Sequence, residues 1–131
     1  MINEPMLFER VDNLITDGEF AQAIPLLTTI LYSTKDSAIR QDCYSLLAYS
    51  YYQCSIYRKA IYFGLMSNKE SKGKTILILQ SLINLKDTDK AFEFLIRSQN
   101  LVPILKQKFM LEIFPDLKDF SNEMKIAYNN L

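Results

Sequence analysis

Three short segments of the chain come into register, and each ends in an alanine. They are residues 18–23, 55–60 and 86–91, which end in Ala23, Ala60 and Ala91. The first two alanines are 37 residues apart and the last two are 31 apart, so the mean period is 34 residues. Self-similarity at a period of about 20–50 residues is typical of stacked repeats, in which each unit buries its apolar face against the next. We expect the linkers between repeats to absorb the difference in spacing.

Apolar residues recur at spacings of three and four along nearly the whole chain, and this pattern predicts an all-α protein without strands. Short breaks at residues 17–18, 54–55 and 86–88 separate the helices of three pairs, and polar linkers at 33–37 and 68–74 separate the pairs. Asp87 or Thr88 is suited to cap a helix start. The chain therefore predicts a series of helical hairpins.

The middle repeat, residues 43–72, resembles a tetratricopeptide repeat. The positions that carry the resemblance are Tyr44, Leu47, Ala48, Tyr51, Tyr57, Ala60 and Ser67. The first repeat matches at Leu7, Val11, Leu14, Gly18, Phe20, Ala23, Leu27 and Ile30, and the third at Ile78, Leu79, Leu82, Ala91, Leu95, Ser98 and the closing Pro103. The resemblance covers about residues 5–103.

The resemblance implies a right-handed helical-hairpin solenoid that forms a single domain over residues 1–131. Its three repeats would span about residues 5–36, 41–72 and 73–103. Because a repeat stack exposes an apolar face at each end, we expect residues 104–131 to form capping helices. The apolar stripes of this segment are Leu105, Phe109, Ile113 and Phe114, followed by Phe120, Met124 and Tyr128.

Three residues depart from the family pattern. Arg10 stands where leucine is expected, and Pro25 falls inside the second helix, where it is expected to kink or delay that helix. Gly64 occupies a position that is usually aromatic, and we expect it to leave space for a bulky neighbour. Its cost in a helix is about 1 kcal/mol relative to alanine.

The family binds partner peptides in a concave groove, and the resemblance places twelve residues of this chain in such a groove. They are Phe8, Asp12, Ile15 and Thr16 in the first repeat, Ser45, Tyr49, Tyr52 and Gln53 in the second, and Ile76, Gln80, Ile83 and Asn84 in the third. Aromatic anchors with adaptable amides are suited to binding protein. The alternative is that these residues pack against another protomer or a following repeat. Tyr44, Tyr51 and Tyr57 are interpreted as packing residues.

The composition argues against catalysis. There is no histidine, which excludes the common Ser-His and Cys-His nucleophilic sites. Residues 72–75 look like the tail of a phosphate loop but lack its upstream glycine, so we interpret them as a linker. Cys43 and Cys54 are predicted to be reduced thiols on one helix, about 16 Å apart and thus too far for a disulfide. We expect no enzyme activity, no metal and no cofactor.

Lys and Arg together number 15, as do Asp and Glu, so the net charge is zero, which disfavours nucleic acid and membrane partners. No apolar run follows a basic start at residues 1–10, so an intracellular location, cytoplasmic or nuclear, is expected. The leading hypothesis is a module that binds a partner protein or peptide within a larger assembly.

Several functions remain open within and beyond that hypothesis. Residues 46–60 faintly resemble the N-terminal repeat domains of anaphase-promoting complex scaffold subunits, which commonly form homodimers. A repeat-type chaperone or carrier of a client protein is the alternative. Binding of single-stranded RNA, as in pentatricopeptide arrays, ranks lower because the candidate groove contains no Lys or Arg.

Overall fold

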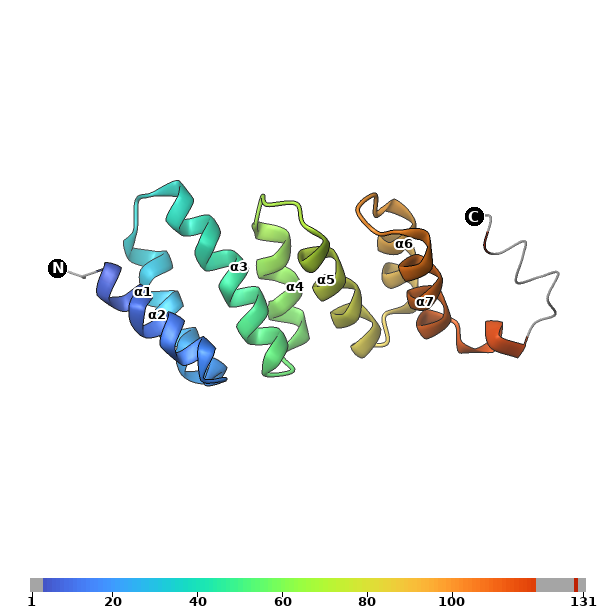
Figure 1. Cartoon of the computed structure of the whole chain (residues 1–131), viewed down its shortest axis with the longest axis horizontal. Helices are drawn as coiled ribbons and strands as arrows, with labels where there is room; N and C mark the ends of the chain where they lie inside the picture. Colours follow the sequence, from blue (N-terminus) through green and yellow to red (C-terminus); the bar gives the residue numbers. More distant parts are fainter. Residues whose placement is uncertain (1–3, 120–128, 130–131) are drawn as a thin grey trace.

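The computed structural model describes residues 4–119 and 129 (Figure 1). This part of the chain is mostly helical and contains no β-strand, so the predicted all-α class is confirmed. The helices are α1 (Glu4–Thr16), α2 (Phe20–Ser33), α3 (Ser37–Gln53), α4 (Tyr57–Met66), α5 (Lys72–Asn84), α6 (Thr88–Arg97), α7 (Pro103–Ile113) and a short 3₁₀ helix, η1 (Pro115–Asp119).

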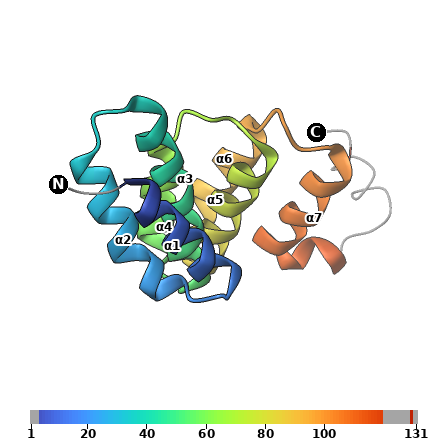
Figure 2. The same ribbon diagram turned by 60° about the vertical axis from the view of Figure 1, so that its left-hand side comes forward.

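Helices that follow one another in the sequence pack against one another, and the pairs succeed each other along the long axis of the molecule (Figure 1). Two further contacts skip a helix, because α3 touches α5 and α5 touches α7. The odd-numbered helices α3, α5 and α7 therefore form a continuous row. Figure 2 shows the same succession of hairpins from the side of α1 and α2.

The three hairpin turns share one backbone geometry. Gly18, Ser55 and Lys86 have φ angles of 78°, 60° and 59°, so each turn has a left-handed residue at the same place. That residue donates its N–H to the carbonyl three positions earlier, and the next residue donates to the carbonyl five positions earlier, over distances between 2.7 and 3.0 Å. This is the Schellman motif that ends many helices. Three sequence segments of unlike composition thus end a helix in the same way.

Ala23, Ala60 and Ala91 occupy equivalent places, five residues after the left-handed residue of each turn. All three have 0% of their surface exposed. Each lies in the first turn of an even-numbered helix and donates its N–H to the carbonyl four residues before it. A small buried side chain lets two helices approach closely. The predicted register of the three alanines is confirmed.

The unequal spacing of the alanines arises in the helices. α2 has 14 residues whereas α4 and α6 have 10 each, and α3 has 17 whereas α5 has 13. The linker at residues 34–36 is shorter than the one at 67–71. The prediction that the linkers absorb the irregularity is therefore wrong, since one extra helical turn in each of α2 and α3 accounts for the longer first period.

The segment of residues 72–75 is helical, so its interpretation as a linker is wrong. α5 begins at Lys72, and Ser71 caps it by accepting a hydrogen bond from the Lys74 N–H at 3.1 Å. The Lys74 ammonium donates to the Ser67 carbonyl at 2.7 Å and to the Glu70 carboxylate at 2.9 Å. These bonds hold the true linker, residues 67–71, against the start of α5.

The cap predicted at Asp87 is confirmed, because its carboxylate accepts a hydrogen bond from the Lys90 N–H at the start of α6.

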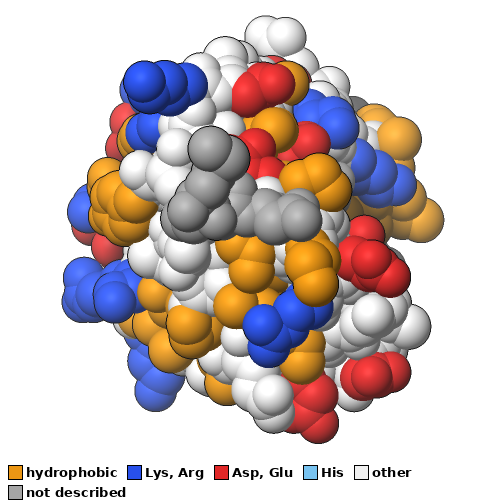
Figure 3. Space-filling view, turned by 90° about the vertical axis from the view of Figure 1, so that its left-hand side faces the viewer, with side chains coloured by type: hydrophobic (Ala, Val, Ile, Leu, Met, Phe, Trp, Pro, Cys, Tyr) orange, Lys and Arg blue, Asp and Glu red, His pale blue; other side chains and the backbone are white. Residues whose placement is uncertain are grey.

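Pro25 lies in the second turn of α2 and does not delay that helix, which begins at Phe20. The position of Arg10 in the fold explains why it can replace the expected leucine. The equivalent residues of the next two hairpins, Leu47 and Ile78, are buried against the preceding helices, whereas Arg10 is exposed at the end of the row. Figure 3 looks onto this end, where charged side chains stand among the apolar ones.

Most buried apolar residues of the described part of the chain belong to two clusters. One is built from α1, α2 and α3, and the other from α5, α6 and α7. At α4, Gly64 is buried against Ile78 of α5, which confirms the expected space for a bulky neighbour.

The predicted capping segment is described only in part. Phe109 and Ile113 of α7 are buried in the second cluster, and Leu105 and Phe114 pack against it. Phe120, Met124 and Tyr128 lie outside the described residues. None of the helices in the described ranges combines the length and the apolar character that a membrane span requires.

Candidate binding surface

The twelve residues of the predicted groove lie on the first three odd-numbered helices, and we call them the odd-helix surface. α1 carries Phe8, Asp12, Ile15 and Thr16, α3 carries Ser45, Tyr49, Tyr52 and Gln53, and α5 carries Ile76, Gln80, Ile83 and Asn84. On each helix the first, second and third of these residues follow at spacings of four and three, which places them on one face.

Exposure divides the odd-helix surface into two groups. Asp12, Thr16, Tyr49, Gln53 and Asn84 are exposed. The other seven are half-buried. Four of these pack against the two core clusters, namely Phe8, Ile15, Ile76 and Ile83. The surface thus presents polar and aromatic groups to solvent on a partly buried apolar base.

Tyr49 is held in place by an aromatic neighbour. Its ring meets the ring of Phe20, at the start of α2, with centroids 5.4 Å apart and an interplanar angle of 84°. This edge-to-face geometry is the favourable one for aromatic pairs. Tyr49 still has 41% of its surface exposed. It therefore combines an ordered ring with a large accessible face.

Tyr52 lies at the C-terminal end of α3, where the hairpin turn brings Tyr57 against it. The two ring centroids are 5.8 Å apart at an angle of 65°. Burial raises the pKa of the Tyr52 hydroxyl, and Tyr57 and the carboxylate of Glu112 raise it further. Glu112 belongs to α7, so this helix influences the same surface. Glu112 was not among the residues that the resemblance assigned to this surface, because the pattern compares positions within the three repeats and α7 follows them.

Ser45 does not offer a free hydroxyl. Its Oγ is 3.1 Å from the Oγ of Ser67, and the two side chains share a hydrogen bond between α3 and the linker after α4. Gln41, one turn earlier on α3, accepts a hydrogen bond from the Asn68 N–H at 2.7 Å. Both contacts fix the linker, so Ser45 has a structural function whatever else the surface does.

The tyrosines interpreted as packing residues do pack. Phe63 of α4 stacks on Tyr51 with parallel rings 5.7 Å apart, and on Tyr44 at 6.3 Å. Tyr44 is buried, and the Lys59 ammonium lies 5.4 Å from the centre of the Tyr51 ring. We call Tyr44, Phe63 and Tyr51 the aromatic stack. It fills the space between α3 and α4.

Cys43 shows no sign of an activated nucleophile. Both cysteines are free, and Cys43 is completely buried. Burial raises the pKa of the Cys43 thiol to about 11, and the nearby Asp42 and Glu4 carboxylates act in the same direction. Reactive cysteines have lowered pKa values. Residues 4–119 and 129 also contain no group of three or more His, Cys, Asp or Glu side chains placed to hold a metal ion.

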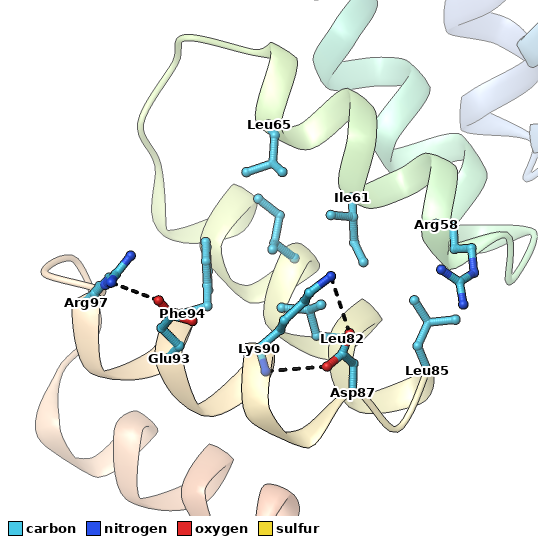
Figure 4. Close-up of a pocket in the computed structure, with 11 residues that line it drawn as sticks. Arg58, Ile61, Leu65, Leu82, Leu85, Asp87, Lys90, Glu93, Phe94 and Arg97 are labelled. Carbon is cyan, nitrogen blue, oxygen red and sulfur yellow. Dashed lines mark hydrogen bonds and ion pairs between the residues drawn. The ribbon is translucent and has the colours of Figure 1, made fainter.

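A groove lies between α4 and α6 (Figure 4), and it was not predicted from the sequence. It has a volume of about 480 Å³ and is lined by apolar residues of α4, α5 and α6 with charged residues at its rim. None of its lining residues belongs to the odd-helix surface. The molecule therefore has two separate candidate surfaces.

Comparison with known proteins gave no match to any family model, curated protein or solved structure. The tetratricopeptide resemblance thus remains a prediction from the residues quoted above.

Proposed function

We propose that the chain is a tetratricopeptide-like helical-repeat module that binds a partner protein or peptide on its odd-helix surface. The observation that carries the proposal is the recurrence, in three hairpins, of the same turn and the same buried alanine. Repeats that stack in this way leave one side of each unit free, and extended binding surfaces are the usual use of such stacks.

The chemistry of the surface favours a protein ligand. Tyr49 supplies an ordered aromatic ring, while Gln53, Gln80 and Asn84 supply amides that both donate and accept hydrogen bonds. Aromatic residues are enriched among those that dominate binding energy at protein interfaces. Because the helices already fix the backbone of these residues, binding a partner does not require the backbone to become ordered.

The charge of the surface restricts the partner. Asp12 carries the one carboxylate among the twelve residues, and none of them is Lys or Arg. A polyanion such as RNA needs cationic side chains to displace its counterions. We therefore propose a partner segment that is near neutral, with apolar and amide side chains, and we assign no catalytic function to the chain.

Comparative affinity capture from native extract tests the proposal. Three exposed residues of the surface are changed together, as Tyr49→Ala, Gln53→Ala and Asn84→Ala. A matched control carries Tyr32→Ala, Gln22→Ala and Asn100→Ala, which remove the same three side-chain types from exposed positions elsewhere. Circular dichroism establishes that both variants are folded.

We expect mass spectrometry to recover a defined set of proteins with the wild type and the control variant and to lose it with the surface variant. Equal recovery with all three baits would contradict the proposal. Recovery of RNA instead of protein, with an affinity that falls steeply as salt is added, would replace it with a different function.

A further inference from the structure

The groove between α4 and α6 has the features of a second docking site. Its apolar lining includes Ile61 of α4, Ile78 and Leu82 of α5, and Phe94 of α6. Figure 4 shows Ile61, Leu82 and Phe94 around the groove. Leu65 of α4 extends the apolar lining and has 61% of its surface exposed. An exposed leucine beside an open apolar groove is a feature of surfaces that bury it against a partner.

Comparison with the preceding hairpin explains why the groove is open. Phe94 is the equivalent of Phe63, because each lies three residues after the buried alanine of its helix. Phe63 is covered by two tyrosines of the aromatic stack, whereas the residues equivalent to Tyr51 and Tyr44 are Leu82 and Thr75. Leu82, which lines the groove, fills less space than the tyrosine ring at the equivalent position 51, and this difference leaves room beside Phe94.

Some charged side chains at the rim of the groove form ion pairs and one does not. Lys90 lies 3.8 Å from the Asp87 carboxylate, and Arg97 lies 2.8 Å from the Glu93 carboxylate, so both acids are paired with basic residues of α6. Arg58, on the opposite wall, forms no ion pair with any described residue. One end of the groove therefore carries a positive charge without a counter-charge.

We propose that this groove binds an amphipathic helix of a partner protein that carries an acidic residue opposite Arg58. Arg58 and Leu65 are seven residues apart on α4, which corresponds to about 10 Å, or two helical turns. A partner helix of that length offers apolar side chains at positions i, i+3 or i+4, and i+7. The acidic residue lies at one end of this apolar stripe, next to Arg58.

This site is independent of the odd-helix surface. None of its lining residues is among the twelve of the odd-helix surface, and the two residues changed to test it, Arg58 and Leu65, are both on α4. The failure of one proposal consequently leaves the other intact, provided that each is tested with its own variants.

Selection from a phage-displayed library of random helical peptides tests the inference with a defined set of probes. The full chain is the only target of this selection, and the Leu65→Lys variant is kept for the affinity measurements. Fluorescence anisotropy then measures the affinity of the enriched synthetic peptides. Since Leu65 is exposed, the lysine is expected to leave the fold intact, and circular dichroism checks this for every variant.

We expect enriched peptides with the apolar spacing described above and one acidic residue at a constant place. Leu65→Lys should weaken their binding at least tenfold, and Tyr49→Ala should leave it unchanged. A second selection on Arg58→Glu should enrich a basic residue at the place of the acidic one. This charge reversal is a result that a general loss of stability cannot produce.

Four results would overturn the inference: no peptide is enriched, the enriched peptides lack this pattern, they bind Leu65→Lys as tightly as the wild type, or Tyr49→Ala abolishes their binding. Sedimentation velocity covers a further outcome. If the chain is a dimer that Leu65→Lys dissociates, a second copy occupies the groove and the proposed partner helix is wrong.

Discussion

Ile78 of α5 packs directly against Gly64 of α4, so closely that a Cβ atom at position 64 would lie 3.2 Å from the Ile78 Cγ1 atom. This contact joins the second hairpin to the third. Gly73, in the first turn of α5, has open space around the corresponding position. The two glycines therefore allow a matched test of how tightly the hairpins are packed.

We expect Gly64→Ala to destabilise the protein by about 1 kcal/mol, because overpacking of about 1–3 kcal/mol exceeds the helix propensity that alanine contributes. Gly73→Ala should instead stabilise it by up to about 1 kcal/mol. Urea unfolding followed by circular dichroism measures both. A stabilising Gly64→Ala would show that α4 and α5 are less tightly packed than described.

The left-handed residues of the turns give a second expectation. Ser55 and Lys86 adopt φ angles of 60° and 59°, which cost non-glycine residues about 1 kcal/mol or more. Ser55→Gly and Lys86→Gly should each stabilise the fold by about 0.5–1 kcal/mol, whereas Gly18→Ala should destabilise it by about 1 kcal/mol. Thermal melts of the three variants check these signs. Destabilisation by both glycine substitutions would contradict the common turn geometry.

The buried alanines should not tolerate a larger side chain. Ala60→Leu inserts three carbon atoms where no surface is exposed, and it should cost at least about 2 kcal/mol. Ala21→Leu is the control, since Ala21 is exposed on α2 and leucine is nearly as good a helix former. Chemical denaturation of the pair measures the difference. If both variants were equally stable, Ala60 would not be a contact point between helices.

Cys43 should make stability fall at alkaline pH. Burial raises its pKa from an ordinary 9.0 to about 11. Between these values the unfolded chain loses the thiol proton while the folded chain keeps it, so the unfolded state is favoured as the pH rises. At about 1.4 kcal/mol for each pKa unit, the loss between pH 9 and pH 11 is about 2 kcal/mol.

Cys43→Ala isolates this contribution from other titrating groups. The difference in unfolding free energy between the wild type and the variant, measured by urea titration at several pH values, should shrink by that amount as the pH rises from 9 to 11. A difference that stays constant over this range would show that the thiol is not desolvated in the folded protein.

Much of the fold was predictable because its signals are local. The turn at Gly18, the cap at Asp87 and the register of the alanines each depend on a few neighbouring residues, and all three agree with the structure. The location of Gly64 beside a bulky side chain was predictable for a related reason, since the repeat pattern names the position that meets the next helix.

The features that escaped prediction depend on contacts between distant residues. Helix lengths differ because α2 and α3 extend by a turn, which no single residue encodes. The Ser45 hydroxyl is occupied by Ser67, 22 residues away. The groove between α4 and α6 is lined by residues of three helices, so its shape depends on how these helices pack against one another.

Site-specific photo-crosslinking tests the central claim most directly. p-Benzoylphenylalanine is placed at Tyr49 on the odd-helix surface and, in a second variant, at Tyr32, which is 81% exposed on α2. After irradiation in native extract, we expect position 49 to form discrete adducts with a partner protein and position 32 to form none of them. Adducts of equal yield and identity at the two positions, or none at position 49, would contradict a binding function for the odd-helix surface.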